Sequence, residues 1–157
     1  MSSMEYIRTE LAEELELYTK GPSASTPGSA GIDLYLASER PITLHHSIPT
    51  ELRTGLHIWT NDDSIMGVLA PRSSSKYRLT NTIGAIDSDY QGELIIKAIS
   101  NSEDDVVTFE PGDKFAQIFL MPVIAPCRVA WAEMDNFSRG TSRGSNGFGS
   151  TGVRIMR

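Results

Sequence analysis

Residues 84–100 read GAIDSDYQGELIIKAIS and join an acidic, turn-forming segment to an apolar run. The run at 94–99 is too short for a typical helix but has the length of a β-strand. It is apolar at both odd and even positions, as is the run at 115–120, whereas a strand with one solvated face alternates. We therefore expect strands covered on both faces, by a second sheet or by another subunit, and an oligomer fits this pattern.

Short apolar runs recur along the chain, at 32–36, 52–59, 65–70, 92–99, 105–109, 115–124 and 128–131. Nearly all have strand length rather than helix length. Turn-forming residues separate them, as in Asn61-Asp62-Asp63 and Pro111-Gly112-Asp113. Strands at such spacings are typical of a β-sandwich or barrel. The sequence therefore predicts an all-β fold.

The chain has the size and apolar content of one domain, with 157 residues of which 39% are hydrophobic. We expect an all-β core at 1–136. Residues 136–152 are rich in Gly, Ser, Thr, Arg and Asn, which predicts a mobile arm at 137–157. The segment 1–20 stays open, because its apolar positions fit one face of a helix and, toward its end, a strand as well.

The charge balance limits the partners. A net charge of −6 and a pI near 5.0 argue against a broad surface for nucleic acid or for an acidic membrane, so any phosphate chemistry must be local. The N-terminus is acidic where a secretory signal would be basic, and no stretch is long enough to span a bilayer. We expect a soluble protein of the cytoplasm or of a host nucleus.

Cysteine and histidine usage indicates neither a disulfide nor a zinc site. Cys127 is the single cysteine and sits among apolar residues, which predicts a small core side chain. His45, His46 and His57 lack the paired spacing of zinc ligands. We assign no transition metal from the sequence.

A first candidate loop, Pro71-Arg72-Ser73-Ser74-Ser75, combines a turn with phosphate-binding residue types. The Arg72 guanidinium can fork onto phosphate oxygens, while hydroxyls and backbone N–H groups donate at close range. Such a loop taken alone is more often a polar turn.

A second candidate loop runs from Gly84 to Glu93 and places Asp87 beside the aliphatic Ile86. A hairpin turn explains Ser88 and Asp89 without a function. It leaves Asp87 unexplained, because a carboxylate in a partly dry site can act as a general base.

A third candidate is the Gly-rich tract RGSNGFGSTG at 143–152. It is neither a Walker loop nor a dinucleotide fingerprint, since no Gly-Lys-Ser/Thr ending and no strand-then-helix context surround it. A low-complexity tail is the plain interpretation. The alternative is a base stacked on Phe148, with backbone N–H groups meeting phosphates.

These three segments, together with AGIDLY at 30–35 and PGDKFAQ at 111–117, resemble the five ordered motifs of trimeric dUTPases from about Gly28 to Gly152. The resemblance implies a distorted jelly-roll β-barrel or sandwich assembled as a homotrimer, with three active sites at subunit interfaces and the C-terminal arm closing over a neighbour's site. It also implies Mg²⁺-assisted hydrolysis of dUTP to dUMP and pyrophosphate, which limits uracil incorporation into DNA and supplies dUMP for thymidylate synthesis.

The resemblance implies a role for each matching residue. Asp87 would orient and deprotonate the attacking water, Ser73 and Gln117 would assist at the phosphates, and Tyr90 would pack on the deoxyribose and exclude a 2′-hydroxyl. Asp33 would reach the metal through water, because Mg²⁺ is held mainly by substrate phosphates. The other substrate contacts implied are Arg72, Ser74, Asn81, Gly84, Ile86, Arg143, Gly147, Phe148, Gly149, Ser150 and Thr151, with Phe148 stacking on uracil.

The sequence departs from the commonest family pattern at Ser74, where Gly is usual, at Lys114, where Arg is usual, and in a short connection between Arg72 and Asp87. Arg139-Gly140 is a second Arg-Gly pair, so the choice of Arg143 rests on its register with Phe148. Two competing functions are a dCTP deaminase of the same superfamily, which lacks the Phe-bearing motif, and a nucleotide-binding module without turnover.

Overall fold

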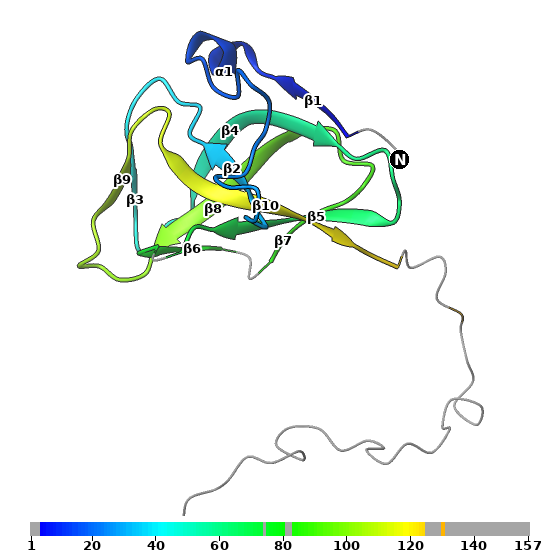
Figure 1. Cartoon of the computed structure of the whole chain (residues 1–157). Coiled ribbons are helices and arrows are strands. Elements are labelled where there is room, and N and C mark those ends of the chain that lie inside the picture. Colours follow the sequence, from blue (N-terminus) through cyan, green and yellow to red (C-terminus); the bar gives the residue numbers. More distant parts are fainter. Residues whose placement is uncertain (1–3, 74, 81–82, 125–129, 131–157) are drawn as a thin grey trace, which may run out of the picture. The chain divides into compact units, whose positions relative to one another are not determined.

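A computed structural model of the protein describes residues 4–73, 75–80, 83–124 and 130. Two four-stranded sheets and a two-stranded ribbon dominate the described part of the chain (Figure 1). The first sheet has the order β1-β4-β8-β6 and is made of β1 (Glu5–Arg8), β4 (Thr50–Trp59), β8 (Glu93–Ser100) and β6 (Tyr77–Leu79). The second has the order β2-β10-β5-β7 and is made of β2 (Ile32–Tyr35), β10 (Lys114–Pro122), β5 (Ile65–Pro71) and β7 (Gly84–Ile86). The ribbon pairs β3 (Ile42–Leu44) with β9 (Val107–Phe109).

Every strand pair in these sheets is antiparallel, and neighbours in a sheet are often distant in the sequence. β10, for example, pairs with both β2 and β5. This pattern is that of a jelly-roll-like all-β fold, which confirms the fold class predicted from the sequence.

The core consists of large apolar side chains that the two sheets contribute to the space between them. Seven of them are almost completely buried: Phe115, Leu34, Leu36, Leu52, Leu56, Leu94 and Ile118. In β8 the buried positions alternate, since Leu94 and Ile96 are buried whereas Ile95 and Ile99 are only half-buried. The second apolar face of this strand is therefore not fully covered by the described part of the chain.

β10 shows the same incomplete cover near its end. Phe115, Ala116 and Ile118 are buried, but Leu120 is 37% and Met121 48% exposed. The sequence predicted that both faces of these strands are covered, by a second sheet or by another subunit. Within the chain, the second sheet covers one face. The described residues leave the other face partly exposed.

The ambiguous N-terminal segment holds both a strand and a helix. β1 is followed by α1 (Glu10–Glu14), and Thr9 between them caps the helix by accepting a hydrogen bond from the Ala12 backbone N–H at 3.3 Å. Ala12 is buried against β4. No helix of the described residues is long and apolar enough to cross a membrane.

Candidate active site

A small polar pocket lies where β2, β10 and β5 run side by side. In the second sheet Gln117 is the register partner of Asp33 on one side and of Ala70 on the other. Pro71 ends β5 at this level, so the turn that follows it starts beside Asp33. The pocket has a volume of about 120 Å³ and is lined by Ser25, Ser29, Gly31, Asp33, Arg72, Ser73 and Gln117.

Asp33 is the buried charge of this pocket, with a side chain only 9% exposed. Its Oδ2 accepts hydrogen bonds from Ser25 Oγ at 2.5 Å and from Lys114 Nζ at 3.0 Å, and Arg72 Nε lies 3.9 Å from Oδ1. Burial opposes ionisation of Asp33, but these donors and charges outweigh it and hold the pKa of the carboxyl below its ordinary value. The same hydrogen bond raises the pKa of Lys114.

Gln117 is fixed by its neighbours on both sides. Its Nε2 donates a hydrogen bond to the Pro71 carbonyl at 3.0 Å. A Cβ at Gly31 would run into the Gln117 carboxamide, so any larger residue there would have to displace this side chain. The AGIDLY segment thus supplies the Asp33 carboxylate, and its Gly31 leaves the space that the Gln117 carboxamide occupies.

The turn after β5 presents its polar groups outward. Arg72 has a side chain that is 46% exposed, and Ser73 is exposed as well. Ser75 Oγ donates a hydrogen bond to the Arg72 carbonyl, which closes the turn. With Arg72 and Lys114 against one carboxylate, the pocket carries an excess positive charge at its rim.

Asp87 and Tyr90 form a second turn, directly after β7. The Tyr90 backbone N–H donates to the Asp87 carbonyl at 3.1 Å. The Asp87 side chain is exposed and Tyr90 is 41% exposed, so a single chain does not hold this carboxylate in a dry site. Gly84 is buried opposite Leu69, where a side chain would collide with the Leu69 Cβ, and Ile86 is half-buried.

Strand register separates the two groups of candidate residues. Ile86, the end of β7, lies opposite Gly67, whereas Pro71 is four positions further along β5. At the rise of a strand that is about 13 Å. β7 is antiparallel to β5, so Asp87 continues away from the pocket. One chain therefore brings Asp33, Arg72, Ser73 and Gln117 together and leaves Asp87 and Tyr90 apart from them.

Several residues implied by the resemblance lie outside the described residues: Ser74, Asn81, Arg143, Gly147, Phe148, Gly149, Ser150 and Thr151. Cys127 and most of the run at 128–131 lie outside them as well. Conversely, the structure adds Ser25 and Ser29 to the pocket and gives Lys114 a contact with Asp33. The sequence offered no periodicity that would have placed the Ser25 loop against Asp33.

No three His, Cys, Asp or Glu side chains among the described residues come together so as to hold a metal ion. Asp33 is the carboxylate nearest the rim cations, and its Oδ2 is already engaged by Ser25 and Lys114. Within the described ranges, the contact of its Oδ1 is the one with Arg72 at 3.9 Å. This donor set does not suit direct coordination, but Oδ1 can accept from a water bound to a metal.

The fold and this pocket define a class: an all-β protein with a small, cation-rimmed site suited to phosphate groups. The chain belongs to the dUTPase family, whose model matches residues 18–152.

Among similar proteins, the deoxyuridine 5'-triphosphate nucleotidohydrolase of Aeromonas hydrophila is 38% identical over 135 residues, covering 83% of this chain and 86% of that protein. The one from Xylella fastidiosa is 40% identical over 137 residues, covering 85% of each.

Solved structures share the fold at lower identity. A mutant dUTPase of Staphylococcus bacteriophage 80alpha, described with dUpNHpp, superimposes with a TM-score of 0.77 at 19% identity, covering 98% of this chain and 100% of that one. A mutant dUTPase from phage phi11 of S. aureus, described as coordinating a structural Mg(II) ion, gives 0.65 at 19% identity, covering 86% of this chain and 98% of that one.

Proposed function

We propose that the protein hydrolyses dUTP to dUMP and pyrophosphate. Family membership and the names of relatives at 38% and 40% identity support this activity. The single observation that carries the proposal within the chain is the convergence of Arg72, Ser73, Gln117 and Asp33 at one polar pocket. The resemblance assigns Arg72, Ser73 and Gln117 to the phosphates and Asp33 to the metal, through water.

In the proposed reaction the pocket binds the phosphate chain. Arg72, which is exposed and only loosely paired with Asp33, can turn its guanidinium to phosphate oxygens. Ser73 donates from the turn toward the α–β bridging oxygen, where negative charge develops as pyrophosphate leaves. Gln117, fixed by Pro71 and Gly31, gives a third donor in a constant position.

Asp87 is the proposed general base, which orients and deprotonates a water for in-line attack on the α-phosphorus. We propose that it comes from a different copy of the chain than the pocket does, which the register of β5 and β7 supports by keeping the two apart in one chain. The half-covered faces of β8 and β10 offer surfaces for such an assembly. We propose a homotrimer with sites between subunits.

Mg²⁺ is the proposed cofactor, and the donor set around Asp33 fits a contact through water rather than a direct one. When bound, Mg²⁺ neutralises charge on the phosphates and orients the α-phosphorus. Asp33 would help to hold the ion by accepting a hydrogen bond from a water, while Lys114 and Ser25 fix the orientation of the carboxylate.

Sugar and base selection are assigned to other segments. Tyr90 packs on the deoxyribose and leaves no room for a 2′-hydroxyl, and Asn81 lies where some family members contact uracil. The core at 1–136 carries these residues. An arm at 137–157 brings Arg143 to the γ-phosphate and Phe148 to the uracil ring, with Gly147, Gly149, Ser150 and Thr151 as further substrate contacts, and serves as a lid.

In the cell, the proposed reaction keeps uracil out of DNA and supplies dUMP for thymidylate synthesis, in a soluble intracellular protein. A dCTP deaminase would release ammonia from dCTP, and a binding module would retain dUTP without turnover. Pyrophosphate release from dUTP, dCTP, dTTP and UTP, measured with saturating Mg²⁺, separates these functions. We expect turnover of dUTP well above that of the other three nucleotides. Release of ammonia from dCTP would indicate a deaminase instead. Binding of dUTP without release of pyrophosphate would indicate a binding module.

A further inference from the structure

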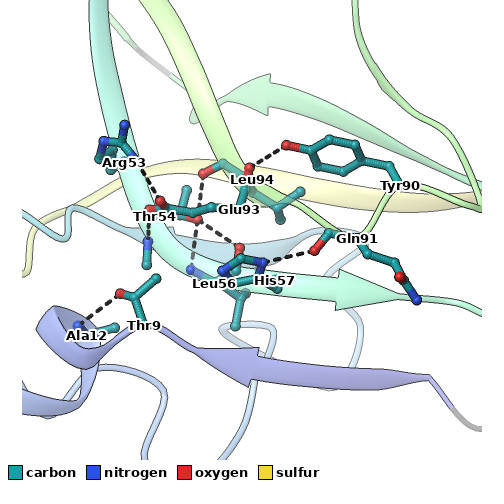
Figure 2. A network of polar contacts seen from close by, with 11 residues as sticks. Thr9, Ala12, Arg53, Thr54, Leu56, His57, Tyr90, Gln91, Glu93 and Leu94 are labelled. Atoms are coloured by element: carbon teal, nitrogen blue, oxygen red, sulfur yellow. Dashed lines mark hydrogen bonds and ion pairs between the residues drawn. The ribbon is translucent and has the colours of Figure 1, made fainter.

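The start of β8 is not held to β4 by a regular ladder. The register between these strands shifts between Arg53 and His57, where Gly55 adopts a φ of 66°. Any side chain at Gly55 would collide with Ala12 and Ala37, so the bulge is fixed to glycine by sterics as well as by conformation. Side-chain hydrogen bonds cross from β4 to β8 at this irregularity, as Figure 2 shows.

Two side chains bridge the bulge. Glu93 accepts a hydrogen bond from the Gly55 N–H on Oε1 at 2.9 Å, and its Oε2 pairs with the Arg53 guanidinium at 2.7 Å. Thr54 Oγ1 donates to the Leu94 carbonyl at 2.7 Å. The Glu93 side chain is 13% exposed, so its carboxylate is largely shielded from water and depends on these partners.

The Tyr90 turn is fastened to the same place. Tyr90 Oη donates to the Glu93 carbonyl at 2.8 Å, which folds the ring back over the chain (Figure 2). A Cβ at Gly92 would run into the Tyr90 ring, so a side chain at this position would displace the ring. His57 Nδ1 lies 3.0 Å from the Gln91 carbonyl and donates to it in the tautomer that carries a proton there.

Resting on the proposed function, we propose that Glu93 is a positioning residue for sugar selection: it fixes the backbone to which Tyr90 is tied. Its carboxylate accepts a hydrogen bond from the Gly55 N–H at the β4 bulge, and its backbone carbonyl accepts one from the Tyr90 hydroxyl. The ring that would pack on the sugar is thereby held by a residue outside the proposed substrate contacts. If the Glu93 backbone were less rigidly held, the Tyr90 ring could move aside and accommodate a 2′-hydroxyl.

The first test is the ratio of kcat/KM for dUTP and UTP in the full-length protein. Glu93→Ala and Tyr90→Phe should each lower this ratio by about 2- to 10-fold, as expected for losing one hydrogen bond. Glu93→Gln keeps an acceptor for the Gly55 N–H and should stay within about 2-fold of wild type. Glu51→Ala removes the other β4–β8 ion pair, with Lys97, and should leave the ratio unchanged.

The double variant Tyr90→Phe/Glu93→Ala separates positioning from general support. If Glu93 acts through Tyr90, the combined loss should be no larger than the greater single loss. The proposal would be overturned if the double variant lost selectivity by the product of the two single losses. It would also be overturned if Glu93→Ala folded and kept the wild-type ratio. Where Glu93→Ala does not fold, Glu93→Asp, whose shorter side chain cannot span Gly55 and Arg53 together, must lower the ratio instead.

Amide hydrogen exchange gives a readout that needs no turnover. In Glu93→Ala, exchange at residues 87–92 should speed up relative to β5, whereas Glu51→Ala should leave it unchanged. Equal exchange in both variants contradicts the positioning role. A wild-type protein that fails to release pyrophosphate from dUTP refutes the proposed function, and the exchange experiment still decides whether Glu93 fixes the turn.

Discussion

Replacing Asp33 with Asn removes the buried charge of the pocket while keeping its size. The variant loses the charge-assisted bond to Lys114 Nζ at 3.0 Å and the weaker attraction to Arg72 Nε at 3.9 Å. A hydrogen bond between charged groups contributes roughly 1.5–3 kcal/mol. Lys114 is 35% exposed and can regain water, so we expect a loss of about 1–2 kcal/mol. For a chain of this length that is a melting-temperature drop of roughly 2–8 °C.

The pH dependence of this loss follows from the pKa shifts. The pKa of Asp33 is lowered from 3.8, so the stabilisation is present above that pH and disappears as the pH falls through the folded-state value. The pKa of Lys114 is raised from 10.5, so the stabilisation is also lost as the pH rises beyond that value. The difference between wild type and Asp33→Asn should be largest near neutrality.

The assay is thermal and urea unfolding at fixed protein concentration, because assembly makes stability concentration-dependent. Glu103→Gln, which neutralises an exposed carboxylate, is the matched control and should change little. Equal stability of wild type and Asp33→Asn at pH 7 would refute the assigned pairing. So would a penalty that stays constant as the pH is lowered below 3.8.

Two substitutions, one truncation and one chelation test the proposed chemistry. Asp87→Asn should lower kcat on the order of 10²–10⁴-fold with binding retained, and near-wild-type pyrophosphate release would exclude it as the base. Tyr90→Ala should narrow the dUTP-to-UTP preference, and equal slowing of both would place sugar selection elsewhere. Truncation after Asn136 should leave a folded but nearly inactive core, since a lost base stack costs about 1–3 kcal/mol; full turnover would remove the arm from the site. EDTA should stop turnover and added Mg²⁺ restore it, whereas undiminished rates in EDTA would exclude the metal.

The fold class could be predicted because strand-length apolar runs and turn residues are local signals. β3, β6 and β7 were missed, since three residues each carry too little pattern to stand out. A helix was one of the two readings left open for segment 1–20, but its bounds were not predicted, because one capped turn beside a strand gives a mixed periodicity. Both failures come from short elements whose stability is tertiary.

The site shows the same limit. Arg72, Ser73, Gln117 and Asp33 were marked by their residue types and by the family resemblance, yet nothing in the sequence placed them in one pocket. Their meeting depends on the pairing of β10 with both β2 and β5, which is non-local. The Glu93 network was missed for the same reason, because it depends on a bulge whose register only the folded sheet defines.

The central claim is that one copy supplies Asp87 and another supplies the phosphate pocket. Asp87→Asn and Ser73→Ala chains, each expected to be inactive alone, can be unfolded, mixed in equal amounts and refolded, with different tags to show that mixed assemblies form. Random assembly of shared sites should leave about one quarter of them with both residues intact, so roughly a quarter of wild-type dUTP turnover should return. Mixed assemblies that stay as inactive as their parents would mean that Asp87 and Ser73 act within one chain, contrary to the separation that β5 and β7 impose.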